Sequence, residues 1–462
     1  MEICKYYRRE YDYSKIRYES MLNPQKGSYP KYVPAKDGSS NSFWMNPNQL
    51  FKRKLQDGNF TLNFHSGHHF RYEEQVGSFD DLAEVLSYTI AKNLGTRVKT
   101  DNNGNSFEAP VVDCAKYELA TFTNAEEQIY RGCVTENIVP NGAHLVKGSD
   151  LLRGIPEGTR PTNSLPDYLK AVEAFGKRMG CAVDKNIEND LIINSYFCWK
   201  IFNSDNHGSN ITFLNQRSPD GGFILTVSPI IDNGSAWELS LPYANQNNPS
   251  EGCRYETIKN SESCVATTDE NGKTTYTFTK EPFVKHTAFS LKAGSLGGHS
   301  KEINGEKFEY EYDLAAHALA NPEVYSAIYS IESNFNLQGA FKEMGDTYRI
   351  LWPDHMKDVI AGASQYKTDL ISSVMADYYC YTAFTNAVGE VNQEQPSEIY
   401  LMFREEMQKL PLQPNAESYM EEFLKIAEQN QVAVDQSQLE NLEFLPKPEN
   451  EQAFVQDDDV VQ

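Results

Sequence analysis

Apolar side chains recur every three to four residues between Ser78 and Gly95, which is the spacing of one buried face of an α-helix. Ser78 and Asp81 stand three residues apart at its start, as a carboxylate variant of the capping box, and Gly95 is typical of a helix end. The apolar stripe consists of Leu82, Val85, Leu86 and Ile90. The pattern therefore predicts a helix over residues 78–94.

Short apolar and aromatic runs lie on both sides of this helix. Residues 42–45 and 49–52 precede it and are bounded by turn-forming Gly, Ser, Asn and Asp residues, which is typical of two strands joined by a turn. Two longer runs, over residues 111–122 and 127–139, follow it. The chain up to about residue 150 is thus predicted to be mostly strands around one helix.

Helical periodicity dominates from about residue 160 to residue 410. Residues 165–179 and 188–202 are predicted helices, a strand pair over 210–227 interrupts the pattern, and a polar stretch over 240–280 is typical of an insertion. Further helices are predicted over residues 313–320, 322–335, 356–362, 368–388, 397–409 and 416–429. The chain is therefore predicted to be an α+β protein with a small strand-rich lobe and a larger helical lobe.

The same patterns suggest where the parts of the chain begin and end. A basic, Tyr-rich segment over residues 1–35 precedes a strand-rich lobe over residues 36–142. A helical lobe over residues 143–430 follows, with an insertion at about 240–300. The last part, residues 431–462, has eight acidic residues and one lysine, and this composition predicts a flexible, disordered tail.

Charge is distributed unevenly along the 462 residues. The formal net charge is −23, whereas residues 1–55 carry eleven Lys/Arg against five Asp/Glu and are therefore at +6. Such an acidic chain repels nucleic acid over most of its surface, so direct nucleic-acid binding is not expected. The eight cysteines are scattered, no apolar leader begins the sequence, and no apolar run is long enough for a transmembrane segment, so we expect a cytoplasmic protein.

Two polar loops follow strongly apolar elements and carry the candidate chemistry. The first places Asp205 and Asn210 five residues apart after the helix over 188–202, and the second places Asp232 shortly after a strand. Phosphoryl transfer from ATP requires a carboxylate that orients the attacking hydroxyl and oxygen ligands that hold Mg²⁺. Either loop alone could be an ordinary turn, because Asp and Asn side chains satisfy local backbone groups. The pair favours a phosphotransferase.

A phosphotransferase also requires a cation that contacts the ATP phosphates. Lys52 is the candidate, and Glu84 on the predicted helix is its candidate partner. The turn that contains Gly38, Ser39 and Ser40 could offer backbone N–H groups to phosphate. The alternative is that Lys52 and Glu84 are solvated surface residues, and their types alone do not decide between the two.

The first half of the chain resembles the HipA-like serine/threonine kinase family over roughly residues 38–240. The matching motifs are the Gly/Ser turn followed by Phe43-Trp44 and Leu50-Phe51-Lys52, the helix with Ala83-Glu84, the segment Leu145–Leu152, the loop Asn203–Asn210 and the run Ser228–Asp232. The resemblance implies a bilobal, protein-kinase-like fold. It departs at Asn206, where the family usually has a basic residue, and in having one Gly in the phosphate loop.

Carried over by position, the resemblance implies a role for each candidate. Asp205 would be the catalytic base, and Asn210 and Asp232 would hold Mg²⁺. Lys52 would contact the phosphates and Glu84 would orient it. The remaining binding residues would be Glu136 and Ile138 at the adenine, His207 beside the catalytic loop or a phosphate, and Gly38, Ser39 and Ser40 at the phosphates.

These patterns predict an ATP- and Mg²⁺-dependent kinase that phosphorylates Ser or Thr on a protein substrate, with a possible regulatory partner. One alternative is a lipid or small-molecule kinase of related fold, since such enzymes have a similar arrangement of acids and amide. Another is a pseudokinase or nucleotide-binding regulatory module, because the single-Gly loop and Asn206 depart from the family pattern.

Overall fold

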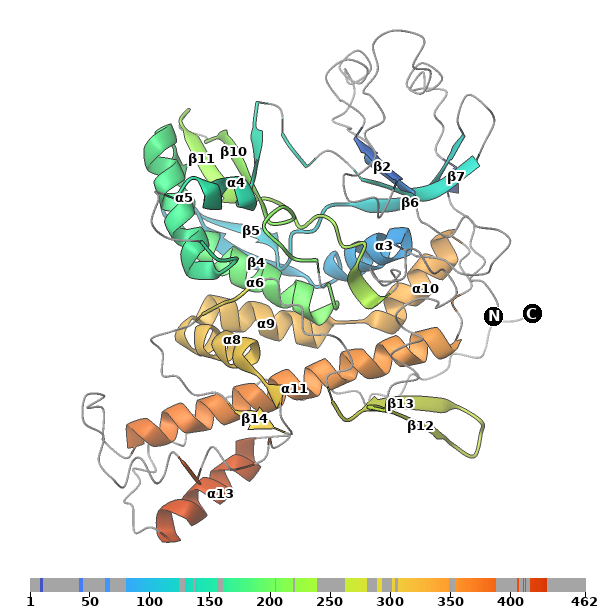
Figure 1. Cartoon of the computed structure of the whole chain (residues 1–462), viewed down its shortest axis with the longest axis vertical. Coiled ribbons are helices and arrows are strands. Elements are labelled where there is room, and N and C mark those ends of the chain that lie inside the picture. The colour runs from blue at the N-terminus through green and yellow to red at the C-terminus, as the bar shows by residue number, and fades with distance from the viewer. Residues whose placement is uncertain are drawn as a thin grey trace. The chain divides into compact units, whose positions relative to one another are not determined.

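The computed structural model contains both helices and sheets (Figure 1), which confirms the predicted mixture of the two. It describes residues 9–10, 41–44, 63–66, 80–123, 129–135, 138–140, 142–155, 161–203, 205–218, 221–238, 262–280, 289–292, 301–303, 306–348, 352, 354–387, 405–406, 410, 412 and 416–429. The chain divides into two compact units, Met1–Lys292 with Phe335–Lys367, and Ala293–Asn334 with Thr368–Gln462. The bilobal arrangement and the predicted domain boundaries remain predictions.

A five-stranded sheet forms the first layer of the first unit. Its order is β1-β6-β7-β3-β2; β1 runs parallel to β6, and the other neighbours are antiparallel. The strands are β1 (Arg9–Glu10), β2 (Asn41–Trp44), β3 (Asn63–Ser66), β6 (Tyr117–Thr123) and β7 (Ile129–Thr135). The predicted strands over 42–45, 111–122 and 127–139 correspond to β2, β6 and β7. The one over 49–52 lies outside the described residues.

Helix α3 (Asp80–Ala91) packs against β3, β6 and β7 of this sheet (Figure 1). The predicted apolar stripe faces the core, since each of its four residues is at most 2% exposed. Glu84 and Ser87 are buried together with that stripe. The predicted helix is confirmed. Its Glu84 carboxylate and Ser87 hydroxyl lie one helical turn apart in the interior of the unit.

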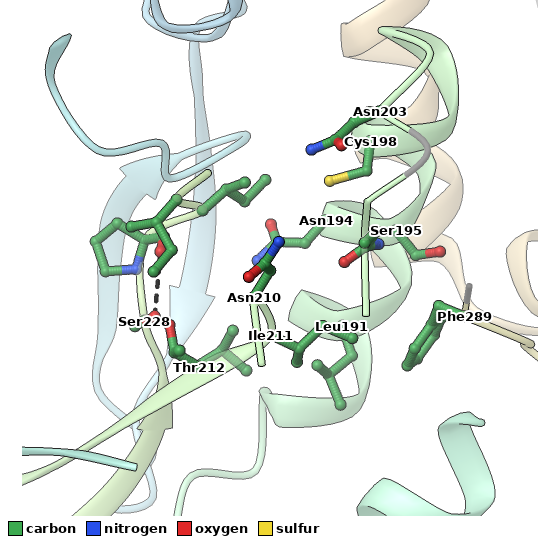
Figure 2. Close-up of a pocket in the computed structure, with 15 residues that line it drawn as sticks. Leu191, Asn194, Ser195, Cys198, Asn203, Asn210, Ile211, Thr212, Ser228 and Phe289 are labelled. Atoms are coloured by element: carbon green, nitrogen blue, oxygen red, sulfur yellow. Dashed lines mark hydrogen bonds between the residues drawn. The ribbon is translucent and has the colours of Figure 1, made fainter. Parts of the chain in front are cut away.

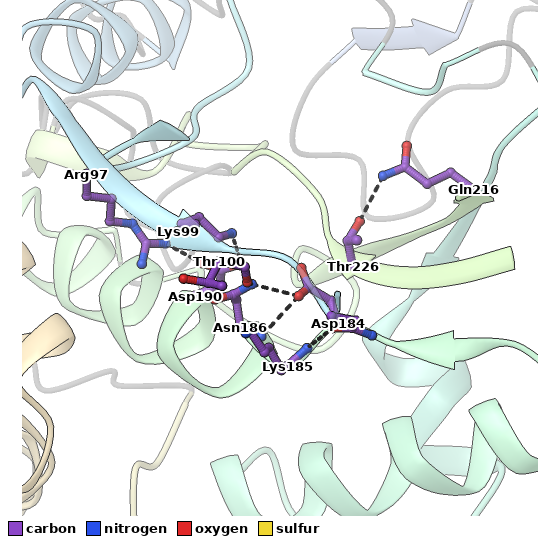
Figure 3. Close-up of polar contacts among 10 residues, drawn as sticks. Arg97, Lys99, Thr100, Asp184, Lys185, Asn186, Asp190, Gln216 and Thr226 are labelled. Atoms are coloured by element: carbon purple, nitrogen blue, oxygen red, sulfur yellow. Dashed lines mark hydrogen bonds and ion pairs between the residues drawn. The ribbon is translucent and has the colours of Figure 1, made fainter. Parts of the chain in front are cut away.

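A hairpin of β4 (Thr96–Thr100) and β5 (Ser106–Pro110) docks on α6 (Ile187–Lys200). Asp190 of α6 forms ion pairs with both Arg97 and Lys99 of β4 (Figure 3). The distance between Lys99 Nζ and Asp190 Oδ2 is 2.7 Å. The Asn186 carboxamide donates to the Thr100 carbonyl over 3.0 Å. The sequence patterns did not predict this hairpin, and its partners lie about ninety residues away along the chain.

A four-stranded sheet lies beside α6. Its order is β8-β10-β11-β9, antiparallel except for the β11–β9 pair. The elements are β8 (His144–Lys147), β9 (Ala182–Val183), β10 (Thr212–Arg217) and β11 (Phe223–Val227), with α4 (Gly148–Arg153) and α5 (Leu165–Met179) packed nearby. The structure confirms the predicted strand pair as β10 and β11, and α5 has the predicted bounds.

The two helices predicted over residues 356–362 and 368–388 form one continuous helix, α11 (Asp354–Ala387). Gly362 does not end the first part; it lets the helix approach the hairpin β12 (Cys264–Thr268)–β13 (Thr274–Phe278). A Cβ at Gly362 would lie 2.0 Å from the Tyr276 carbonyl oxygen. Helix α10 (Leu337–Tyr348), which also belongs to the first unit, was not predicted.

The second unit contains α8 (Glu309–Ala320), α9 (Pro322–Asn334), α13 (Ala416–Gln429), the later part of α11 and the short pair β14 (Glu302–Ile303)–β15 (Glu306–Lys307). Lys301 and Asp377 form a fully buried ion pair. The Tyr312 hydroxyl donates to Asp377 over 2.6 Å, and the Lys301 ammonium lies 5.2 Å from the Tyr419 ring. Burial lowers the pKa of Lys301, and the Asp377 carboxylate opposes this shift.

Other sequence-based predictions fall on residues that the structure does not describe. Most of residues 1–35, the predicted tail over 431–462 and most of the predicted helix over 397–409 lie outside the described residues. Within the part that is described, no helix combines the length and hydrophobicity that a bilayer crossing requires.

Substitution Asp190→Asn tests the docking of the β4–β5 hairpin. It leaves Arg97 and Lys99, whose side chains are 11% and 13% exposed, without their carboxylate. We expect the free energy of unfolding, measured in urea, to fall by about 3 kcal/mol. Asp150→Asn is the matched control, since Asp150 is 55% exposed beside Arg153, and it should change stability by less than about 1 kcal/mol. Equal effects would contradict the structural role of Asp190.

Candidate functional site

The buried carboxamide of Asn203 joins the two predicted loops. It lies just after α6 and is 6% exposed. Its Oδ1 accepts the backbone N–H of Asp205 over 3.0 Å. Its Nδ2 donates to the Asp232 carbonyl oxygen over 3.2 Å and to Asn233 Oδ1 over 3.0 Å. The Asn203 side chain therefore holds the loop of Asp205 next to the turn of Asp232, although the two are far apart in sequence.

The loop after Asn203 arranges its polar side chains around the Asp205 carboxylate. His207 Nε2 lies 3.2 Å from Asp205 Oδ1. The Asn210 carboxamide donates to the Asp205 carbonyl over 2.8 Å and to Oδ2 over 3.3 Å. The Asp205 and His207 side chains are 43% and 48% exposed, so the carboxylate is oriented from both sides and still accessible to a substrate.

Asp232 lies in a turn whose backbone is left-handed. Its φ is 62°, a conformation that non-glycine residues seldom adopt and that costs on the order of 1–3 kcal/mol. The next backbone N–H, at Asn233, donates to Glu84 Oε2 over 2.8 Å, and Asn233 is fully buried. Helix α3 and Asn203 therefore hold the turn from both sides, which fixes the position of the Asp232 backbone.

Helix α3 holds the following segment as well. The Trp237 indole N–H donates to Ser87 Oγ over 2.9 Å, one helical turn after Glu84. Trp237, the middle residue of the short 3₁₀ element η4 (Ala236–Glu238), also has a left-handed backbone, with φ of 62°. Its backbone N–H donates to the Ile201 carbonyl over 2.9 Å. The chain from Asp232 to Trp237 is thus tied to both α3 and the end of α6.

Two weakly acidic groups beside this turn are held neutral. Burial, followed by the nearby Glu84 carboxylate, raises the pKa of the Tyr117 phenol well above its usual value. The same two causes raise the pKa of Cys114, whose Sγ lies 3.7 Å from Asn233 Nδ2. Neither group therefore adds negative charge at neutral pH.

Lys367 of α11 contacts the C-terminal end of α6, which leads into the loop of Asp205. Its ammonium donates to the Trp199 carbonyl over 2.5 Å and lies 4.4 Å and 4.5 Å from the ring centroids of Trp199 and Phe202. A cation is favourable at a helix C-terminus, and it stabilises Phe202, whose own φ is 59°. No local sequence pattern signals this role, because Lys367 reaches α6 only through the fold.

Tyr168 of α5 supports the middle of the loop. Its hydroxyl donates to Asn163 Oδ1 over 2.8 Å, and Asn163 Nδ2 donates to the Asn206 carbonyl over 3.4 Å. A Cβ at Gly208 would lie 3.0 Å from the Tyr168 hydroxyl. Glycine at position 208 therefore lets the loop approach the Tyr168 side chain closely.

The structure brings five of the predicted site residues into one network, namely Glu84, Asp205, His207, Asn210 and Asp232. Glu84 contacts the turn after Asp232, which the sequence had not indicated. Ile138 is half-buried between β7 and β8. Lys52, Glu136, Gly38, Ser39 and Ser40 lie outside the described residues, so their roles remain predictions, as do the chemical roles of the other five.

The described residues include no group of three or more His, Cys, Asp or Glu side chains that could hold a metal ion. Asn210 and Asp232 offer one carboxamide and one carboxylate. Mg²⁺ is commonly held by one or two protein oxygens together with substrate phosphates and water, so donors of these two types are of the kind that Mg²⁺ takes.

Substitution Asn203→Asp tests whether this carboxamide joins the loops. Aspartate can still accept from the Asp205 N–H, but it places a negative charge against the Asp232 carbonyl and Asn233 Oδ1. The free energy of unfolding in urea should fall by about 2–3 kcal/mol. Asn271→Asp, in the exposed β12–β13 turn, is the control and should be within about 0.5 kcal/mol of wild type. A loss no larger than the control would contradict the role of Asn203.

Comparisons with known proteins identify no family for this chain. No family model matches it, and no curated protein matches it. Among solved structures, the chain is similar to the Helicobacter pylori proinflammatory kinase CtkA, with 14% identity, a TM-score of 0.34, and coverage of 69% of this chain and 87% of that one. A similarity this low carries no argument about fold or activity, so any function must be argued from the described residues.

Proposed function

We propose that the protein is an ATP- and Mg²⁺-dependent phosphotransferase that transfers the γ-phosphoryl group to a hydroxyl. The observation that carries the proposal is the contact of one buried carboxamide, that of Asn203, with both loops. It joins the loop of Asp205 and Asn210 to the turn of Asp232. Phosphoryl transfer depends mainly on positioning and charge stabilisation, and the fixed relation of two loops that carry these acids supports the proposal.

Asp205 is the proposed catalytic base. Its carboxylate is oriented by His207 and Asn210 and remains accessible. It would accept the proton of the attacking hydroxyl as the bond to phosphorus forms. His207 would keep Asp205 in place, and its exposed ring could also contact a phosphate.

Asn210 and Asp232 are the proposed Mg²⁺ ligands. Bound Mg²⁺ would neutralise charge on the β- and γ-phosphates. The left-handed turn at Asp232 and the contacts of its backbone with Asn203 and Glu84 would fix the backbone that carries one ligand before the nucleotide binds. Preorganised charge of this kind is often the largest contribution to catalysis.

Glu84 connects helix α3 to this site through the Asn233 N–H. The proposed pairing of Glu84 with Lys52 would add the phosphate-binding cation, with the turn of Gly38, Ser39 and Ser40 and the segment from Glu136 to Ile138 around the nucleotide. These parts of the proposal, and a protein Ser or Thr acceptor, rest on the resemblance to HipA-like kinases.

The test is incubation of the purified protein with ATP labelled at the γ-phosphate, Mg²⁺ and a mixture of acceptor proteins, with label on protein and released phosphate measured together. Asp205→Asn and Asp232→Asn should each lower total transfer by about 100-fold or more, since each removes a charge needed in the transition state. Asp346→Asn is the control, because that side chain is 69% exposed beside Lys342, and it should retain wild-type transfer. Unchanged transfer in either site variant would contradict the assignment.

A further inference from the structure

Both ring nitrogens of His207 make polar contacts within the loop of the proposed catalytic base. Nδ1 lies 3.1 Å from the backbone nitrogen of Ser209, and Nε2 lies 3.2 Å from Asp205 Oδ1. The first partner can only donate, because it is a backbone N–H, and the second can only accept when it is an ionised carboxylate. The two contacts together therefore determine which ring nitrogen carries the proton.

The contacts select one tautomer of the neutral imidazole. Nδ1 offers its lone pair to the Ser209 N–H, so the proton lies on Nε2, which donates it to Asp205. The other tautomer, with the proton on Nδ1, would set two N–H groups against each other and leave Nε2 with no proton to donate. Since both nitrogens are engaged, holding Asp205, rather than contacting a phosphate, is the role that this loop conformation supports.

The peptide group that binds Nδ1 is itself held by two helices. The Gly208 carbonyl and the Ser209 N–H belong to one planar peptide and point in opposite directions. This carbonyl accepts from the Ser149 N–H near the start of α4 over 2.7 Å. On the side of α5, a Cβ at Gly208 would lie 3.0 Å from the Tyr168 hydroxyl. These contacts fix the direction in which the Ser209 N–H points.

The other end of the loop is held against α6. The backbone N–H groups of Asn210 and Ile211 both donate to the His207 carbonyl, over 2.8 Å and 3.0 Å. Asn210 and Ile211 also line a small pocket together with Asn194 of α6 (Figure 2). The main chain of His207 is therefore held as well as its ring, while Asn210 Nδ2 donates to the second oxygen of Asp205.

We infer that His207 is a positioning residue whose proton is kept on Nε2 by the Ser209 N–H, and that it orients Asp205 without taking a proton from it. The inference rests on the proposed phosphotransferase function. In the transfer step the acceptor oxygen bonds to the γ-phosphorus, the bond from that phosphorus to the bridging oxygen of ADP breaks, and the hydroxyl proton passes to Asp205. Because Nε2 already carries a proton, the proton on Asp205 leaves to water, to which this side chain is 43% exposed.

The tautomer can be measured independently of catalysis. The purified protein is labelled with isotope-enriched histidine, and the imidazole nitrogens are observed by NMR at neutral pH. The signals of His207 are those that the His207→Gln variant lacks. We expect a protonated Nε2 and an unprotonated Nδ1 at His207, with His144, exposed on β8, as the reference ring. A proton on Nδ1 of His207 would overturn the inference.

Two substitutions separate the contacts of the ring. His207→Gln places an amide N–H where Nε2 stands, so it can still donate to Asp205, whereas His207→Asn can accept from Ser209 but does not reach Asp205. Neither amide can act as a base at neutral pH. We expect His207→Asn to lower the kcat of phosphoryl transfer by about 10- to 100-fold and His207→Gln to remain within about threefold of wild type. His144→Gln is the matched control and should retain wild-type transfer.

The outcomes separate the inference from the function on which it rests. The Nε2-protonated tautomer together with activity in His207→Gln supports the inference. A loss in His207→Gln as large as that in His207→Asn would overturn it, because donation to Asp205 would then not be sufficient. Full activity in His207→Asn would also overturn it, because Asp205 would need no donor at this position. Absence of both transfer and ATP hydrolysis in the wild type would overturn the proposed function and this inference with it.

Discussion

The hydrogen bonds of Asn203 are the constraint on which the candidate site depends. One carboxamide accepts from the Asp205 backbone and donates to the carbonyl of Asp232 and the side chain of Asn233. Because the group is buried, losing either set of partners would leave polar atoms unsatisfied. The relative position of the two loops is therefore fixed by the fold before any ligand binds, and this supports the proposal that both loops act on one substrate.

Three residues other than glycine have left-handed backbones around this carboxamide, namely Phe202, Asp232 and Trp237. Conformations of this kind persist where surrounding contacts determine them, and they concentrate at functional sites. Here the contacts come from α3, through Glu84 and Ser87, and from α11, through Lys367. Elements distant in sequence thus stabilise a strained loop junction, which is the arrangement that preorganised catalysis requires.

Local sequence patterns predicted the elements whose signals are local. The apolar stripe of α3, the periodicity of α5 and the acids and amides of both loops could each be recognised from neighbouring residues. The β4–β5 hairpin was missed although its turn is local, since Asp101 accepts from the backbone N–H groups of Asn103 and Asn105 and Gly104 has a φ of 90°. Only the docking of this hairpin on Asp190 depends on residues far along the chain. One predicted helix ended at Gly362, but in the structure this residue makes room for Tyr276 within the continuous helix α11. The linking role of Asn203 and the support from Lys367 also have no local pattern, because both depend on tertiary contacts.

The most direct test of the account is calorimetric titration of ATP into the wild-type protein and into Asp232→Asn, each with Mg²⁺ and with EDTA. If Asn210 and Asp232 hold a metal with the nucleotide, the wild type should bind ATP about tenfold or more tightly with Mg²⁺ than with EDTA, and Asp232→Asn should lose most of that difference. ATP affinity that depends neither on Mg²⁺ nor on Asp232 would contradict the joint site on which the proposed function rests.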